Sequence, residues 1–138
     1  MAELKEETYL WEHWKFNADQ RIRAFNFYVV FAVFGNGVMF SAMDRQFHPA
    51  LEVLLGGFIA LLAVVFAIVD SRSRHLLRLS KAGLKVFEQA LPPQSRPFQL
   101  DDQNGRWLVR YTVAFNLLFA AQFVFGLGVM AHGLWRWG

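Results

Sequence analysis

Three long apolar blocks dominate the pattern of the chain, and charged residues gather between them. The blocks cover residues 25–43, 51–69 and 111–134, and the second one, LEVLLGGFIALLAVVFAIV, contains a single charge, Glu52, near its edge. At the rise of an α-helix the second block extends about 28 Å, close to the roughly 30 Å hydrocarbon core of a bilayer. The pattern predicts an all-α integral membrane protein with transmembrane helices over 25–43, 51–70 and 111–134.

Two other interpretations of the blocks are less favoured. A hydrophobic content of 55% in 138 residues would also suit one soluble domain, but helices of small soluble domains keep a polar face, and the block at 51–69 has none. A secretory signal peptide is disfavoured because the first block follows an acidic and polar leader and is not followed by an evident small-residue cleavage site. We therefore expect the first segment to stay in the mature protein.

The distribution of Lys and Arg predicts the orientation, since acidic residues contribute little to it. Four basic residues precede the first block and eight lie between the second and third, whereas Arg45 and Arg136 stand alone in the other two segments. The eight are Arg72, Arg74, Arg78, Lys81, Lys85, Arg96, Arg106 and Arg110. We expect a bacterial inner-membrane protein with a cytoplasmic N-terminus and a periplasmic C-terminus. Trp107 and Tyr111 suit an aromatic belt at the inner boundary, and Trp135 and Trp137 suit one at the outer boundary.

Residues 1–24 are predicted to form an amphipathic leader helix on the cytoplasmic side. Apolar residues recur there at helical spacing, namely Leu10, Trp14, Ala18, Ile22 and Phe25. Asn17 is a weak helix former that would suit a bend before the first span. Such a helix can lie in the membrane interface with Trp11 and Trp14 at headgroup level, or it can pack against a partner.

The segment 71–110 is predicted to be a basic cytoplasmic helix followed by a loop. Nothing between residues 51 and 91 must break a helix, so the second span can continue for about 60 Å until Pro92 and Pro93. The segment 92–105 reads as a polar loop. An apolar stripe at 77, 84 and 91 requires a partner, either the leader helix or another copy. The predicted partner-binding residues are Trp11, Trp14, Arg74, Arg78, Lys81 and Lys85.

Four amide side chains lie in the apolar blocks. Asn26 stands at the start of the first block, and the three farther inside are Asn36, Asn116 and Gln122. Amides in hydrocarbon seek hydrogen-bond partners, so one interpretation is that they join helices to one another. The other is that a homo-oligomer turns them toward a common axis, where they line a water-filled pore. Gly35 and Gly37 flank Asn36 and would let another helix approach closely. The paired glycines at 56–57 and at 126 and 128 are expected to be packing contacts.

The sequence offers no recognisable catalytic chemistry. The chain has no cysteine, no nucleotide-binding loop, and no two histidines spaced three or four residues apart on one helix. We expect no catalytic residue, no metal and no cofactor, although His48 and His132 leave a haem-bearing electron-transfer subunit open as a minor alternative. Nucleic-acid binding is disfavoured because the basic residues lie beside predicted spans, where anionic lipid contact explains them.

The run YLWEHWKFNADQRIRAFNFYVVF resembles small multi-span bacterial inner-membrane effectors of anti-phage defence systems. The resemblance implies a homo-oligomer that breaches the membrane when a separate cytoplasmic sensor protein activates it, although a third span departs from the two-span pattern. The expected function is therefore an oligomeric pore, or a protein that gates one, in a membrane-disrupting defence effector. The alternative is a non-conducting scaffold or accessory subunit that recruits a cytoplasmic partner.

Overall fold

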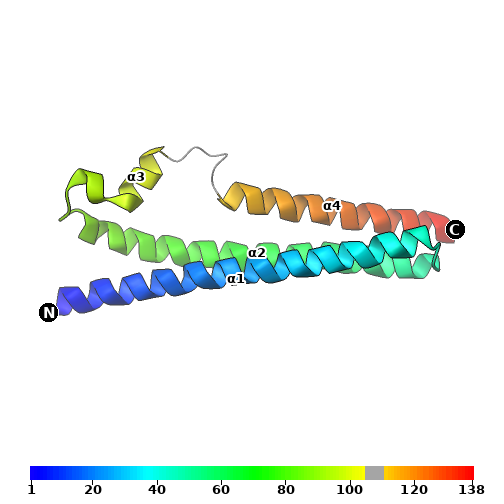
Figure 1. Ribbon diagram of the computed structural model, residues 1–138, viewed down its shortest axis with the longest axis horizontal. Helices are drawn as coiled ribbons and strands as arrows, with labels where there is room; N and C mark the ends of the chain where they lie inside the picture. The colour runs from blue at the N-terminus through cyan, green and yellow to red at the C-terminus, as the bar shows by residue number, and fades with distance from the viewer. Residues whose placement is uncertain (105–110) are drawn as a thin grey trace.

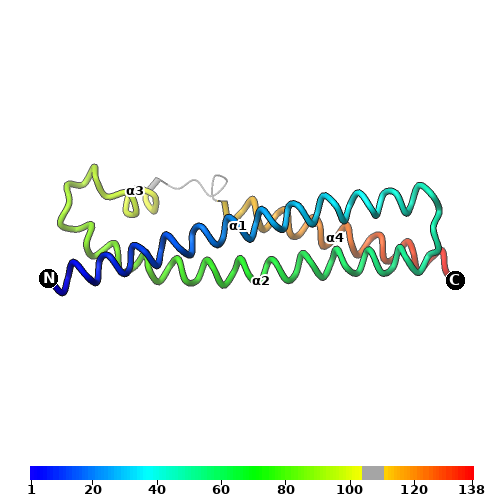
Figure 2. The backbone as a smooth tube through the Cα atoms, turned by 60° about the horizontal axis from the view of Figure 1, so that its bottom comes forward, coloured from blue at the N-terminus to red at the C-terminus, as the bar shows by residue number. Residues whose placement is uncertain are grey.

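The computed structural model describes residues 1–104 and 111–138, and every regular element among them is a helix. Helices α1 (Ala2–Asp44) and α2 (Pro49–Glu88) run antiparallel along their whole length (Figures 1 and 2). Helix α4 (Tyr111–Trp137) lies along the half that contains the α1–α2 connection. The short elements η1 (Pro93–Ser95) and α3 (Pro97–Asn104) lie along the other half. Helices α1, α2 and α4 are long and apolar enough to cross a membrane, which confirms the all-helical part of the prediction.

Helices α1 and α2 continue without a break from their polar into their apolar sections. The predicted leader and first span form one helix of 43 residues, about 64 Å long. Asn17 does not break it, because its side-chain amide donates a hydrogen bond to the His13 carbonyl, 2.7 Å away, within the same helix. Helix α2 has 40 residues and is about 60 Å long, as the absence of a breaker up to Pro92 predicts.

The α1–α2 connection is short because each helix end is capped. Gln46 has a left-handed φ of 51°, and the Phe47 amide donates to the Ala42 carbonyl at 3.0 Å. A residue in the left-handed conformation, usually glycine, commonly ends a helix in this way, and Gln46 takes that position in α1. The His48 ring accepts a hydrogen bond from the Ala50 amide at 3.2 Å, and Pro49 opens α2 with its fixed φ. The chain therefore reverses direction within four residues.

Between their charged ends the three long helices form what we call the apolar zone, comprising residues 24–43, 53–69 and 113–131, none of which carries a formal charge. Helix α2 contacts both α1 and α4 extensively. One buried cluster joins Tyr28 and Ala32 of α1 to Phe115 and Phe119 of α4. A second cluster, nearer the connection, contains Met39, Ile59 and Val129. Aromatic rings stack between α1 and α4, with 3.8 Å between the ring centroids of Phe25 and Phe115.

Helices α2 and α4 meet backbone to backbone at two glycines. A Cβ added to Gly126 would lie 2.7 Å from the Ala60 nitrogen and 2.7 Å from the Gly56 carbonyl oxygen. A Cβ added to Gly56 would lie 2.6 Å from the Gly126 oxygen. Small residues at facing positions permit this approach, as is common between helices in membranes. The packing role predicted for Gly56 and Gly126 is confirmed, whereas a Cβ added to Gly128 would meet nothing within 4 Å, because this glycine lies on the surface of α4.

One detail of the prediction was wrong, because part of the expected polar loop is helix α3. Ile22, one of the apolar residues at helical spacing in the leader, is 58% exposed. The buried face of α1 instead contains Asn17 and half-buried Arg21. Asn17 donates to the His13 carbonyl of the same helix, whereas Arg21 pairs with Asp70 of α2 and contacts Thr112 of α4, which periodicity along α1 does not reveal. Arg106, Trp107 and Arg110 lie outside the described residues.

We predict opposite effects for two alanine substitutions on α4. Gly126→Ala should lower the free energy of unfolding by about 1–3 kcal/mol, because the new methyl group meets backbone atoms that cannot move aside unless the helices part. Gly128→Ala should raise it by about 0.5–1 kcal/mol, because alanine is the better helix former and the site is open. Denaturant titration in detergent micelles measures both values. A Gly126→Ala protein as stable as the parent would contradict the close packing of α2 and α4.

Candidate functional site

At the end of the apolar zone farther from the connection, Arg21 joins all three long helices. Its Nε lies 2.5 Å from Oδ1 of the buried Asp70 on α2, and its Nη2 lies 3.4 Å from the Thr112 hydroxyl on α4. Its guanidinium also lies over the Phe115 ring, 5.0 Å from the centroid. Arg74, one turn along α2, places its Nε 3.1 Å from the other carboxylate oxygen of Asp70. Two guanidiniums thus share one buried carboxylate.

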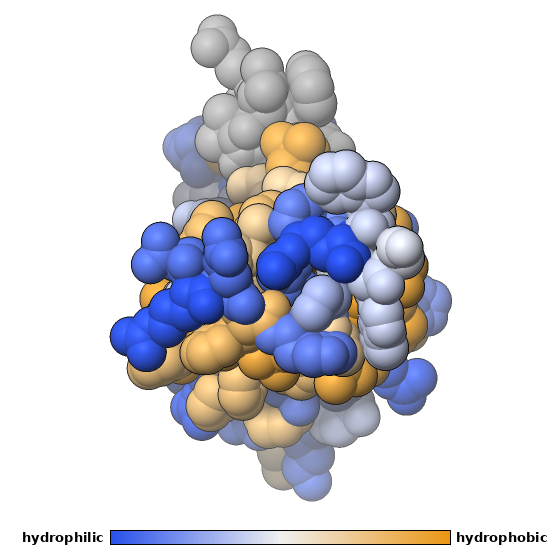
Figure 3. Space-filling view, turned by 90° about the vertical axis from the view of Figure 1, so that its right-hand side faces the viewer, coloured by the Kyte–Doolittle hydropathy of each residue, from blue (hydrophilic) through white to orange (hydrophobic). Residues whose placement is uncertain are grey.

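A second buried carboxylate lies at the connection end. Glu52 of α2 is fully buried and is paired with two side chains of α4. His132 Nδ1 lies 3.0 Å from one carboxylate oxygen, and Arg136 donates to the other. Trp137 packs edge-on against the His48 ring, with 6.0 Å between the centroids. Viewed from this end, the bundle shows hydrophilic side chains gathered at its tip among apolar ones (Figure 3).

The two carboxylate clusters bracket the apolar zone. Glu52 and Asp70 are 18 residues apart on one helix, which corresponds to about 27 Å. This separation matches the roughly 30 Å hydrocarbon core of a bilayer. Each carboxylate is buried together with a cationic partner, as charges at the border of a low-dielectric region require.

Asn36 of α1 and Gln122 of α4 both lie in the middle of the apolar zone. Each stands between the cluster around Tyr28 and Phe119 and the cluster around Met39 and Val129. Each amide has a buried side-chain oxygen with no hydrogen-bond partner among the described residues. Buried polar atoms of this kind are rare and are commonly associated with unplaced water or with function. The two predicted residues are therefore buried, unpaired amides between the two apolar clusters.

Asn116, the third predicted amide, lies elsewhere. It is exposed on the surface of α4 within the apolar zone, as is Asn26 on α1. An amide on a surface that faces lipid has no partner for its hydrogen bonds, so such a residue favours contact with water or with another protein chain. The structure does not bring Asn116 to the space between the two apolar clusters, where Asn36 and Gln122 lie.

Beyond Asp70, residues 2–20 of α1, residues 71–88 of α2 and α3 form what we call the extension. The predicted stripe on α2 packs against the leader, because Leu84 is buried and a Cβ on Gly83 would lie 2.7 Å from Leu10 Cδ1. His13 Nδ1 lies 2.5 Å from the Ser80 hydroxyl. Ser80 is 1% exposed and therefore cannot meet a substrate. The histidine and serine tie α1 to α2.

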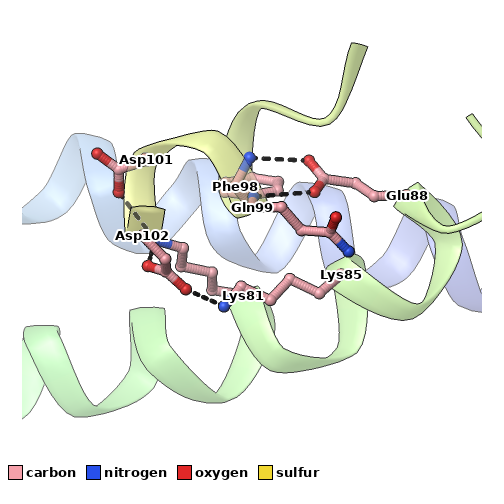
Figure 4. A network of polar contacts seen from close by, with 7 residues as sticks. All are labelled: Lys81, Lys85, Glu88, Phe98, Gln99, Asp101 and Asp102. Carbon is pink, nitrogen blue, oxygen red and sulfur yellow. Dashed lines mark hydrogen bonds and ion pairs between the residues drawn. The ribbon is translucent and has the colours of Figure 1, made fainter. Parts of the chain in front are cut away.

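Ion pairs and backbone hydrogen bonds hold α3 against α2 (Figure 4). Lys81 Nζ lies 2.9 Å from Asp101 and 2.8 Å from Asp102, and Lys85 also pairs with Asp102. The buried carboxylate of Glu88 accepts hydrogen bonds from the first amides of α3, at 3.0 Å from Phe98 N and 3.3 Å from Gln99 N. Glu88 thus replaces the local N-cap that the sequence of α3 lacks.

These contacts shift the pKa of two groups in opposite directions. Hydrogen bonds from Lys81 and Lys85 lower the pKa of Asp102 to about 2. Burial alone would lower the pKa of Lys81, but its hydrogen bonds to Asp102 and Asp101 outweigh that effect and raise the pKa. Both ionised forms are therefore favoured when α3 is docked.

Most of the predicted partner-binding residues are engaged within the chain. Trp14 packs edge-on against Phe98 of α3, with 5.4 Å between the ring centroids, and Trp11 stacks on Trp14. Arg74, Lys81 and Lys85 pair with carboxylates of α2 and α3. Trp11 is 48% exposed, and Arg78 is exposed. Only part of the predicted partner surface therefore faces outward.

Sequence reasoning did not find the two carboxylate clusters. The signal that was present is the spacing of Glu52 and Asp70, which stand at the two borders of the second apolar block, together with His132 and Arg136 four residues apart on α4. Among the described residues, no three histidine, aspartate or glutamate side chains are arranged to hold a metal ion.

We predict that Asp70→Asn destabilises the fold by about 3–5 kcal/mol, because it leaves two half-buried guanidiniums without a counter-ion. Asp44→Asn, at the exposed end of α1, should change stability by less than about 0.5 kcal/mol. Adding Arg21→Gln to Asp70→Asn should recover part of the loss, since the unpaired charge is removed. Thermal unfolding in detergent tests the three proteins, and equal melting temperatures for the two aspartate variants would exclude Asp70 as a structural anchor.

The docking of α3 should depend on pH. Because the pKa of Asp102 is lowered, the stabilisation that its carboxylate gives to the docked α3 is complete above about pH 4 and is lost as the pH falls toward 2. The raised pKa of Lys81 preserves the pairs up to about pH 10. Spin labels on Ala82→Cys and Gln103→Cys can report the α2–α3 distance, since the chain has no native cysteine.

That distance distribution should broaden by pH 2. Asp102→Asn should broaden it at neutral pH, whereas Asp101→Asn, which removes only one contact to Lys81, should change it little. Identical distributions at pH 6 and pH 2 would contradict the role of Asp102.

No model of a protein family, no curated protein and no solved structure matches this chain.

Proposed function

We propose that this chain acts as a homo-oligomer in the bacterial inner membrane, where its copies form or gate a pore. The apolar zone lies in the hydrocarbon core, the extension and the N-terminus lie in the cytoplasm, and the C-terminus faces the periplasm. The distribution of Lys and Arg and the length of about 27 Å between Glu52 and Asp70 support this placement.

In this proposal the conduit lies between copies. The helices of one copy approach backbone to backbone at Gly56 and Gly126, and the aromatic clusters around Tyr28 and Phe119 fill the space between α1 and α4. This close packing argues against a water-filled path through a single copy.

The observation that carries the proposal is the exposed amide of Asn116 on the apolar surface of α4. A hydrogen-bonding group at this depth is costly in lipid and favourable in a pore, where it contacts water. Ala120, on the same side of α4 one turn farther along, is also exposed and is small enough to keep such a path open. Asn116 would thus form a polar ring near the cytoplasmic mouth of the pore.

Asn36 and Gln122 have a different part in this mechanism. Their unpaired oxygens lie inside one copy, between two apolar clusters. In this proposal the two amides therefore do not line the conduit between copies.

A defence role and a sensor partner follow from the resemblance of the leader and first span to membrane-disrupting effectors. One observation favours the alternative of a non-conducting accessory subunit. The extension projects about 27 Å beyond Asp70 and presents exposed Trp11 and Arg78, which a cytoplasmic protein could contact.

We predict that the protein reconstituted into lipid vesicles releases trapped potassium, and that Asn116→Leu lowers the rate by about tenfold or more because it removes the polar lining of the pore. Gln122→Leu is the matched control. Since Gln122 lies inside one copy, this variant should retain the permeability of the open state.

Ion flux from vesicles and the oligomer mass in detergent should be measured on the same preparations. An assembled wild-type protein that releases no potassium, even with the cytoplasmic fraction of its host added, would reject the pore and favour the accessory subunit. Equal flux from wild type and Asn116→Leu would remove Asn116 from the conduit.

A further inference from the structure

Two edges of the α1–α2 pair are left uncovered along their whole length. Helices α3 and α4 both lie on the same side of this pair (Figure 1). The edge of α1 that points away from α2, which we call the α1 edge, contains Glu12, Phe16, Asp19, Asn26 and Gly37. The edge of α2 that points away from α1, the α2 edge, contains His75, Leu79, Ala82 and Val86, which are exposed, and it is bordered by Gly57, which is half-buried beside Met130 of α4.

The α1 edge exposes an apolar side chain in the polar extension and polar or small residues within the apolar zone. Contact with water alone or with lipid alone does not explain this combination. Glu12, Asp19 and Asn26 recur every seven residues and so share one face of the helix. Phe16 is 66% exposed in the extension, where no lipid tails surround it, while Asn26 and Gly37 are exposed within the apolar zone. A Cβ on Gly37 would meet nothing within 4 Å, so this glycine serves no close approach inside the chain.

The α2 edge also presents exposed apolar side chains. The segment that carries it is basic, whereas the segment that carries the α1 edge in the extension is acidic. Residues 75, 79, 82 and 86 follow helical spacing, and Leu79 and Val86 are 57% and 63% exposed. Residues 1–20 contain five acidic and two basic side chains, whereas residues 71–90 contain five basic and one acidic. Among the described residues, Glu12, Arg72 and Arg78 take part in no ion pair of the chain.

We infer that the α1 edge of one copy packs against the α2 edge of the next copy. This inference rests on the homo-oligomer proposed above and identifies its interface. The contact repeats the antiparallel α1–α2 arrangement found within one copy, so that α1 and α2 alternate around the assembly. Because the two edges differ, each copy binds two neighbours, and the contacts close into a ring when the rotation between copies permits.

The membrane fixes the register of this interface, because all copies lie at the same depth. Within one copy, His13 meets Ser80, Leu10 meets Gly83, Tyr28 meets Phe66 and Gly35 meets Ile59. In each of these pairs the two residue numbers total 93 or 94. The same totals hold between copies at equal depth, since the helices rise equally per residue.

This register places matching groups opposite one another. Gly37 is level with Gly57, which lets two backbones approach inside the membrane as small residues do between other membrane helices. Phe16 falls between His75 and Leu79, and Glu12 falls between Leu79 and Ala82. Asp19, which pairs with Arg23 of its own helix, falls between Arg72 and His75, so its carboxylate can gain a second partner from the next copy.

Disulfide cross-linking tests the interface directly, because the chain has no native cysteine. A protein with both Phe16→Cys and Leu79→Cys should form a ladder of dimers, trimers and larger species on oxidation in membranes, since each copy is linked to two neighbours. The pair Phe16→Cys and Val86→Cys is about 13 Å out of register and should give at least about tenfold less multimer. Neither Phe16→Cys nor Leu79→Cys alone should cross-link.

A second substitution keeps the test independent of the introduced cysteines. Gly37→Leu should abolish the oligomer in native mass spectrometry without lowering the melting temperature of the single copy, since the site is open and leucine is the better helix former. Gly128→Leu is the matched control, because its Cβ is equally open but lies on α4, away from both edges. This control should keep the oligomer.

The possible outcomes test the proposed interface and the proposed pore separately. A ladder without potassium flux upholds the interface and rejects the pore. An oligomer that gives no ladder with the in-register pair, or that survives Gly37→Leu, overturns the interface and leaves a homo-oligomer of another kind. A monomer in native mass spectrometry overturns both.

Discussion

The pairing of two buried carboxylates on α2 with cations of the other helices determines how the bundle is assembled. Asp70 holds Arg21 of α1 at one border of the apolar zone, and Glu52 holds His132 and Arg136 of α4 at the other. A charge buried without a partner is strongly unfavourable, so neither helix can slide along α2 without losing its pair. Helix α2 thereby sets the register of α1 and of α4.

The remaining packing depends on this register. It brings Gly126 against Gly56, where a shift of one residue would drive a side chain into a backbone. It also stacks Phe25 on Phe115 and sets Tyr28 against Phe119. The extension follows the same register, since Leu10 and His13 of α1 meet Gly83 and Ser80 of α2.

Hydrophobic patterning was sufficient to predict the three long helices and the continuation of α2, because both depend on composition and on the absence of breakers along one segment. Features that depend on a second segment were not predictable. Helix α3 is capped by Glu88, ten residues before the first amide that donates to it, and Arg21 is accommodated by Asp70 and Thr112 on two other helices. Likewise, the sequence identified Asn36, Asn116 and Gln122 as unusual but not their rotation, so it could not separate the two inward amides from the outward one.

The uninterrupted course of α1 and α2 has a mechanical consequence. Neither helix has a break where it leaves the apolar zone, and a straight α-helix is stiff about its own axis. Torque applied at the far end of the extension is therefore not absorbed at a hinge but is transmitted along both helices. The pair, about 60 Å long, connects the surface at Trp11 and Arg78 mechanically to the opposite end of the bundle.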